Sequence, residues 1–152
     1  NVGRYINLLK SNTINIVAFE PLKYLFKILR LIFRHKRIKL FNYFKSNVNS
    51  NIIHLPIETK NSTDVAFSIP LVFKNIEHKK TMLDFCKNSN IETRPIISGN
   101  LLKQTCYSHF DNYTKFKNSE YIDVHGFYVG LHSKLKFEYV KLLVEEINKL
   151  SI

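Results

Sequence analysis

A strand, a helix and a second strand follow one another directly in the middle of the sequence. Residues 65–74 (VAFSIPLVFK) show the alternation of a half-buried strand, and Pro70 predicts a sheet edge or a bulge. Residues 76–88 repeat apolar side chains at helical spacing, and Asn90 is a suitable left-handed cap. Residues 91–94 then return to β-forming types. A helix between two short strands favours a small α+β unit.

The flanking segments extend this unit. Residues 52–55 predict a short strand that ends at Pro56, and residues 126–130 (GFYVG) predict a buried strand bounded by glycines. Residues 108–119 are polar and predict a loop. The closing stretch predicts an amphipathic helix over 136–150, with these side chains inward: Phe137, Val140, Val144 and Ile147.

A long basic amphipathic helix is predicted over residues 20–45, where apolar and cationic side chains form opposite stripes. Pro21 suits its first turn, and Glu20 suits the positive end of its dipole. Before it, residues 14–17 form either a short strand or the frayed end of a preceding domain. The apolar run over 22–33 is too short, and too interrupted by Lys and Arg, for a transmembrane span.

Three roles remain open for this helix. A connecting helix that packs on a neighbouring domain or subunit is the interpretation we favour, because such helices are common in globular chains. An amphipathic helix on an anionic membrane and a nucleic-acid-binding helix are the alternatives. Nucleic-acid binding predicts affinity that falls steeply with salt.

Size and charge indicate one globular domain. The chain has 152 residues, is 45% hydrophobic and carries a formal net charge of +11. Such a charge favours polyanionic partners. However, the abundance of Lys, Asn, Ile, Phe and Tyr is also the bias of an AT-rich genome, so charge alone gives no strong indication of a nucleic-acid or membrane partner.

The cysteines and histidines predict neither a disulfide framework nor a metal site. Cys86 falls at an apolar helical position, and Cys106 has no partner at metal-ligand spacing. The histidines are scattered, without an HxxxH or HExxH arrangement. We expect reduced thiols in the cytoplasm. No signal peptide is visible, and the chain starts without Met, so we expect a piece of a longer protein.

The stretch 91–104 (IETRPIISGNLLKQ) is the best candidate site. Arg94 stands at a strand end, Pro95 stops any helix, and residues 98–100 (Ser-Gly-Asn) form a turn before an apolar helical start. A rigid strand followed by a free loop is where domains present residues to ligands. The alternative is an ordinary connection with a surface arginine.

Several strings occur in a fixed order that resembles the C-terminal region of the DegT/StrS-type sugar aminotransferases. They are the strand AFSIPLVFK, the loop IETRPIISGNLLKQ, the segment SEYIDVHGFYVGLH and the closing helix. The segment RIKLFNYF (37–44) is similar to the family's helix that leads into its small domain.

This resemblance implies an α+β fold: the small C-terminal domain of an aspartate-aminotransferase-like, fold type I enzyme. Residues 1–45 would be an N-terminal segment with a basic linker helix, and residues 46–152 the small domain. The family uses pyridoxal phosphate to aminate nucleotide-linked keto-sugars in deoxyamino-sugar biosynthesis, and some relatives dehydrate a deoxysugar instead. The Schiff-base lysine lies in a large domain not recognisable here, so we assign no catalytic residue and expect no covalent pyridoxal phosphate on this chain.

The resemblance also implies partners and contact residues. We expect Arg94 to bind an anion of the sugar nucleotide because its guanidinium offers two parallel donors. Asn100 either orients a sugar hydroxyl or, as we favour, caps the following helix. His132, just after a strand, is the third candidate for substrate contact. The partner would be a large cofactor-binding domain or an intact paralogue, in a parent that forms homodimers. A degenerate regulatory remnant is the remaining alternative.

Overall fold

The computed structural model describes residues 14–107, 109–110 and 115–150, with side chains from residue 23 onward. The chain divides into two compact units, Asn1–Lys36 and Arg37–Ile152. The predicted boundary between residues 45 and 46 stays a prediction. Residues 1–13, and residues 108 and 111–114 of the predicted 108–119 loop, lie outside the described part of the chain.

The amphipathic helix is longer than its pattern predicted. Helix α2 covers Ile14–Asn47, so the short strand expected over 14–17 is wrong. Pro21 consequently lies inside the helix rather than in its first turn. A proline in this position removes one backbone hydrogen bond of the helix and disfavours a straight continuation of it.

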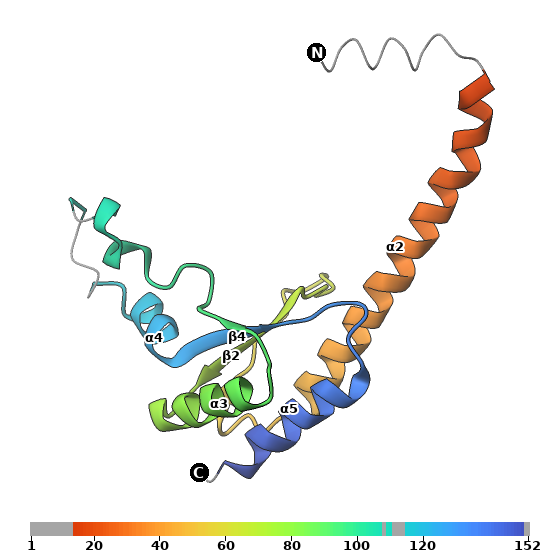
Figure 1. Ribbon diagram of the computed structural model, residues 1–152. Coiled ribbons are helices and arrows are strands. Elements are labelled where there is room, and N and C mark those ends of the chain that lie inside the picture. Colours follow the sequence, from red (N-terminus) through yellow and green to blue (C-terminus); the bar gives the residue numbers. More distant parts are fainter. Residues whose placement is uncertain (1–13, 108, 111–114, 151–152) are drawn as a thin grey trace. The chain divides into compact units, whose positions relative to one another are not determined.

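Four antiparallel strands form one sheet in the order β1-β2-β4-β3. They are β1 (Ile53–His54), β2 (Ser68–Phe73), β3 (Thr93–Arg94) and β4 (Gly126–Gly130), and the two longer ones lie side by side in Figure 1. Strand β1 pairs only with Val72 and Phe73. At Pro70 strand β2 therefore has a neighbour on the β4 side alone, which agrees with the predicted edge position.

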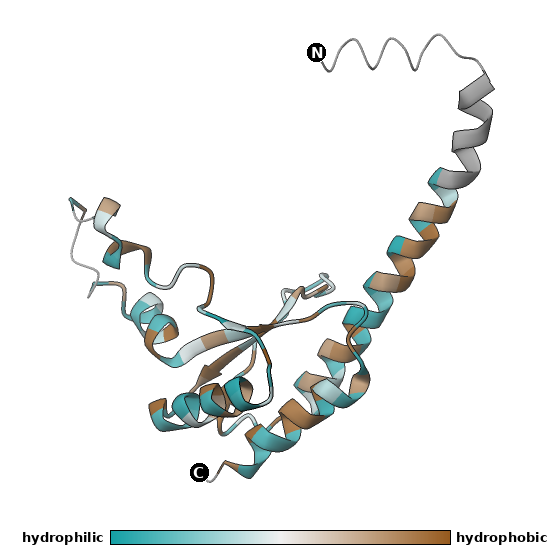
Figure 2. Cartoon of the chain, in the orientation of Figure 1, coloured by the Kyte–Doolittle hydropathy of each residue, from teal (hydrophilic) through white to brown (hydrophobic). Residues whose placement is uncertain are grey.

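One face of the sheet carries the hydrophobic core. Alternate residues of β2 and β4 are buried, as period-two alternation requires. Helix α3 (Ile76–Asn88) and helix α5 (Phe137–Lys149) pack on this face together with the last turns of α2. Figure 2 shows the matching alternation of hydrophobic and hydrophilic residues along α5. These side chains of the helices are buried: Leu40, Phe41 and Phe44 of α2, Met82 and Cys86 of α3, and Val140, Leu143, Val144 and Ile147 of α5.

Helix α3 has the bounds and the left-handed turn at its end that the sequence predicts, whereas its cap at the start, Asn75, was not predicted. At its start, the Asn75 side chain accepts a hydrogen bond from the backbone N–H of Glu77 at 2.9 Å. At its end, Asn90 adopts φ +54°, and the N–H of Ile91 donates to the carbonyl of Cys86 at 2.8 Å. This left-handed turn directs the chain from the helix into β3.

The segment between β3 and β4 contains two short 3₁₀ turns and a helix that the sequence did not indicate. The turns cover Leu101–Lys103 (η1) and Thr105–Tyr107 (η2), and α4 covers Lys117–His125. Lys79 of α3 donates from Nζ to the carbonyls of Asp123 and Val124, at 3.2 and 2.6 Å. This amine satisfies acceptors that the C-terminus of α4 leaves open.

The observed elements confirm the α+β class. The helix predicted over 136–150 is α5, although Phe137 is 38% exposed and packs against the ring of Tyr43 instead of entering the core. Within the part of the chain that the structure describes, no helix has the length and hydropathy needed to cross a bilayer.

Candidate functional site at the edge of strand β3

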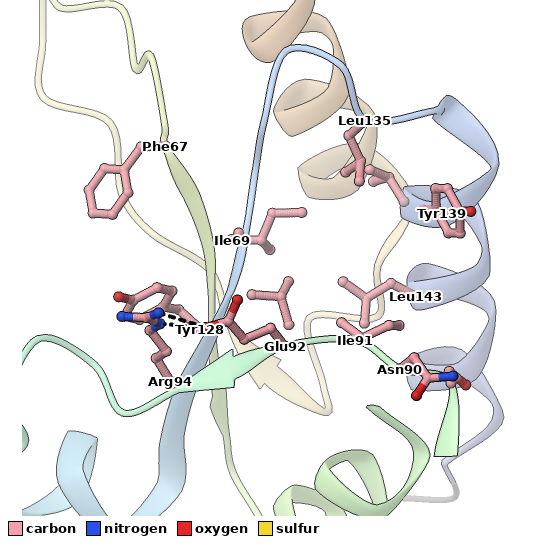
Figure 3. A pocket seen from close by; sticks show the side chains of 14 residues that line it. Phe67, Ile69, Asn90, Ile91, Glu92, Arg94, Tyr128, Leu135, Tyr139 and Leu143 are labelled. Atoms are coloured by element: carbon pink, nitrogen blue, oxygen red, sulfur yellow. Dashed lines mark hydrogen bonds and ion pairs between the residues drawn. The ribbon is translucent and has the colours of Figure 1, made fainter. Parts of the chain in front are cut away.

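A pocket of about 540 Å³ lies where β3 meets β4 and the start of α5 (Figure 3). Strand β3 pairs with β4 only at Thr93 and Arg94. The chain that precedes Thr93 diverges from the edge of the sheet, and the pocket occupies the space between them. The lining residues are Phe67, Ile69, Ser89, Asn90, Ile91, Glu92, Arg94, Tyr128, Val129, Gly130, Leu135, Tyr139, Val140 and Leu143. Most are apolar, and the charged pair in the lining is Glu92 and Arg94.

Arg94 is fixed by its neighbour in the strand segment. Its Nε and Nη2 donate to one oxygen of Glu92, Oε1, at 2.9 and 2.6 Å. The hydrogen bond and charge of Glu92 raise the pKa of the guanidinium, which stays a cation. A guanidinium has five N–H donors, so three remain, two on Nη1 and one on Nη2. Adjacent donors of this kind suit a phosphate or carboxylate.

Tyr128 forms a second part of the pocket, although it lies in the stretch 126–130 that the sequence predicts as a buried strand. It is half-buried, faces Arg94 across the β3–β4 pairing, and meets Phe67 edge to face with ring centroids 6.2 Å apart. In a strand bounded by Gly126 and Gly130, the middle residue is on the face opposite to Phe127 and Val129. This alternation is the sequence signal that could have placed Tyr128 on the face away from the core. For Glu92 the signal is its position two residues before Arg94, which puts both side chains on the same side of an extended segment.

Asn100 is buried and organises the loop after β3. Its Oδ1 accepts from the N–H of Leu102 at 3.2 Å, the helix-capping role that we favoured, and its Nδ2 donates to Glu120 Oε2 at 3.1 Å. Lys103 binds Glu120 and Asp123 of α4 at 2.7 and 2.8 Å. These ion pairs raise the pKa of the Lys103 amine. The loop is thereby attached to α4 by side-chain bonds.

The tip of this loop has an unusual backbone. Gly99 has φ +70°, and a Cβ at this position would overlap the Asp123 carboxylate. Ile97 also has positive φ, +56°, while its side chain is 87% exposed. Positive φ is costly for a β-branched residue, so the loop holds Ile97 in a strained conformation.

His132 lies beyond the end of β4. Its Nδ1 accepts from the N–H of Lys134 at 3.1 Å, and the ring is exposed. Neither His132 nor Asn100 lines the pocket, so the structure places only Arg94 of the three predicted contacts there. Substrate binding by all three stays a prediction.

Two further reactive side chains, Cys86 and Lys79, are held within the fold. Cys86 is buried, which raises the pKa of its thiol to about 11, whereas Cys106 is exposed. Burial lowers the pKa of the Lys79 amine, which is occupied by the α4 carbonyls. Within the described ranges, no group of three or more His, Cys, Asp or Glu is placed to hold a metal ion.

Two enzymes of the same name are similar to this chain. The GDP-4-keto-6-deoxy-D-mannose 3-dehydratase of Escherichia coli O55:H7 is 32% identical over 91 residues, covering 58% of this chain and 24% of the relative. The enzyme of the same name from Yersinia pseudotuberculosis is 31% identical over 121 residues, covering 77% and 31%. The chain thus spans about a third or less of the length of these relatives.

A solved structure and a family model agree with these similarities. The E. coli GDP-4-keto-6-deoxy-D-mannose-3-dehydratase with bound hydrated pyridoxal phosphate superimposes with a TM-score of 0.65 at 26% identity. That match covers 83% of this chain and 33% of the enzyme. The model of the DegT/DnrJ/EryC1/StrS aminotransferase family matches residues 22–148. The chain belongs to the DegT/DnrJ/EryC1/StrS aminotransferase family.

Proposed function

We propose that this chain is the small C-terminal domain of a pyridoxal-phosphate enzyme acting on a nucleotide-linked keto-deoxysugar, and that it does not catalyse the reaction alone. The observation that carries the proposal is the match to one third of a dehydratase that binds pyridoxal phosphate. In this proposal residues 1–45 form a basic linker, residues 46–152 form the small domain, and a large domain supplied from elsewhere holds the cofactor.

Lys79 and Lys103, the described lysines whose pKa values are shifted, do not suit covalent attachment of the cofactor. A Schiff base needs an amine that can lose its proton and face the coenzyme. Lys103 is held as a cation by two carboxylates, and the Lys79 amine is bound to two carbonyls of α4. Neither lines the pocket. These two lysines are therefore not assigned to the cofactor, and no step involving the cofactor is assigned to the described residues.

The pocket suits the task of holding a sugar nucleotide. The three uncommitted N–H donors of Arg94 would bind its phosphate oxygens, and the apolar lining would exclude water from the sugar. We assign the first contact to Arg94. Asn100 would keep the loop in place while acting as a further contact, and His132, exposed after β4, would approach a substrate carried by the partner domain.

Titration of the full chain with GDP tests the pocket. We expect amide NMR shifts around residues 91–94 and 128–130, and their loss in Arg94→Ala. The matched control is Arg34→Ala, which removes the same charge from α2, outside the pocket. Equal weakening by both substitutions, or no binding by the parent chain, would contradict the role of the pocket.

Borohydride reduction after mixing with pyridoxal phosphate tests the second part of the proposal. We expect slow labelling spread over many exposed lysines, with no site favoured. Peptide mass mapping that finds stoichiometric labelling of one lysine would contradict the claim that the cofactor lysine is elsewhere. This result is independent of the GDP titration, so the two parts can fail separately.

A further inference from the structure

The pocket beside β3 is larger than the anion site at Arg94 requires. Its volume of about 540 Å³ lies within the range of sites that bind whole small molecules. Figure 3 shows Arg94 and Tyr128 on one side of the pocket, and Asn90, Tyr139 and Leu143 on the other. The last three residues define the α5 side of the pocket. A phosphate bound by Arg94 would leave this side open to a further part of the same ligand.

The α5 side combines an apolar wall with polar groups that are available to a ligand. Leu143 is a buried part of the wall, whereas Tyr139, in the first turn of α5, is 52% exposed. Within the described residues, neither the Tyr139 hydroxyl nor the Asn90 side-chain amide has a hydrogen-bond partner. Such a lining suits a flat ligand with apolar faces and hydrogen-bonding edges. A nucleobase has both properties.

The chemistry of the ligand indicates which of its parts lies there. A nucleotide-linked keto-sugar has two arms, the keto-sugar and the nucleoside, on opposite sides of the diphosphate. This step rests on the proposed function, in which a large domain holds the cofactor. The keto-sugar must reach that cofactor, so it would remain at the Arg94 side, next to Phe67 and Tyr128. The nucleoside does not react and is the arm that this domain can hold.

We propose that the α5 side of the pocket binds the nucleobase of the sugar nucleotide, with the ring of Tyr139 against the face of the base. The side-chain amide of Asn90 would pair with the edge of the base, because it offers a donor and an acceptor next to each other. Asn90 is already fixed at φ +54° by the turn that ends α3. The ribose would cross the apolar lining between Arg94 and Tyr139.

Two ligands that differ only in the base test this assignment on the full chain. GMP and the methyl riboside of ribose 5-phosphate carry the same phosphate and ribose. In calorimetric titration we expect GMP to bind about tenfold more tightly, because stacking of a base on an aromatic side chain contributes free energy of this size. Equal affinities for the two ligands would overturn the base site.

Substitution of Tyr139 tests the stacking contact. Tyr139→Leu should lose about tenfold in affinity for GMP and bind the methyl riboside as the parent does, whereas Tyr139→Phe keeps the ring and should retain GMP binding. The control is Tyr24→Leu, at an exposed tyrosine of α2 outside the pocket. Unchanged GMP binding in Tyr139→Leu, or an equal loss in Tyr24→Leu, would overturn the role of Tyr139.

A glycine substitution tests the contact with the edge of the base. Asn90→Gly removes the amide and still permits positive φ, so the turn after α3 is kept. We expect GMP to bind about three- to tenfold more weakly, with no change for the methyl riboside. Asn61→Gly, at another asparagine with positive φ and outside the pocket, is the matched control. Unchanged GMP binding in Asn90→Gly would overturn the assignment of the base edge to Asn90.

Arg94→Ala separates this inference from the proposed function. Both ligands carry the phosphate, so this variant should weaken both by the same factor. If the parent chain binds neither ligand, or if Arg94→Ala has no effect, the proposed function fails and the base site fails with it. If Arg94→Ala weakens both ligands but the parent binds them equally, the anion site stands and the base site alone is overturned.

Discussion

Arg94 donates two hydrogen bonds, from Nε and Nη2, to the same oxygen of Glu92. The pair keeps the guanidinium in place at the pocket and leaves Nη1 available. It also puts a negative charge beside the proposed anion site. Glu92 thus orients Arg94 and at the same time opposes the binding of an anion.

Replacing Glu92 should separate these two effects. Glu92→Gln retains a carbonyl oxygen for Arg94 but removes the competing charge, so we expect affinity for GDP to rise about three- to tenfold. Calorimetric titration measures this change. Glu145→Gln, an exposed acidic residue of α5 outside the pocket, is the control for net charge and should have little effect. Unchanged or weaker binding in Glu92→Gln would show that its charge does not limit the site.

Two glycines provide a matched test of the loop. Gly99→Ala would introduce a Cβ at positive φ against Asp123, and we expect a loss of about 1–3 kcal/mol in the free energy of unfolding. A Cβ at Gly130 meets no atom within 4 Å, so Gly130→Ala should change stability far less. Urea denaturation of both variants measures the difference. Similar values for the two would mean that the contact with Asp123 carries no cost.

The strained Ile97 predicts a stabilising substitution. Asparagine tolerates positive φ better than isoleucine, and the side chain at this position is exposed. Ile97→Asn should raise the free energy of unfolding by about 1 kcal/mol. Thermal denaturation with Ile57→Asn, an exposed isoleucine elsewhere, provides the comparison. A destabilised Ile97→Asn would indicate that the isoleucine makes a contact worth more than its strain.

Cys86 predicts a dependence of stability on alkaline pH. Burial raises the pKa of its thiol from 9.0 to about 11, so the unfolded state loses this proton first as pH rises. The stability contribution is complete below pH 9 and is lost between pH 9 and about 11, in total about 2–3 kcal/mol.

Comparison of variants isolates this contribution. Cys86→Ala should be less stable at neutral pH, because a buried atom is removed, but should show a shallower decline above pH 9. Cys106→Ser, at the exposed cysteine, should keep the slope of the parent chain. Equal slopes in all three chains would contradict an ionisation penalty at Cys86.

Local sequence patterns predicted the fold correctly where a residue acts through the conformation of its own backbone, or where apolar residues repeat with the period of a helix or strand. Asn90 at the end of α3 and the alternation in β2 are of this kind. Helix α4 was missed because none of its residues is fully buried and Phe116 provides no side-chain cap. Bonds from Lys79, distant in sequence, help to hold α4 in place.

The candidate site, too, was predictable only where the local sequence determines the structure. Arg94 was found because a strand end before a proline presents its side chain, but the pocket beside it depends on α5 and Phe67, which are distant in sequence. The capping role of Asn100 was predicted from its position before an apolar turn, whereas its bond to Glu120 depends on the placement of α4. Contacts of this kind, between elements that are distant in sequence, can be identified only from the assembled fold.

The strand order β1-β2-β4-β3 also determines when the chain can fold during synthesis. Strands β1 and β2 are neighbours in sequence and can pair early, but among the described strands β3 pairs only with β4, which follows about thirty residues later. A nascent chain that ends before Gly126 leaves the inner edge of β2 open and Arg94 on an unpaired segment. Emergence of the five residues Gly126–Gly130 from the ribosome would therefore close the sheet, whereas the pocket would be complete only once Leu135 and the lining residues of α5 follow.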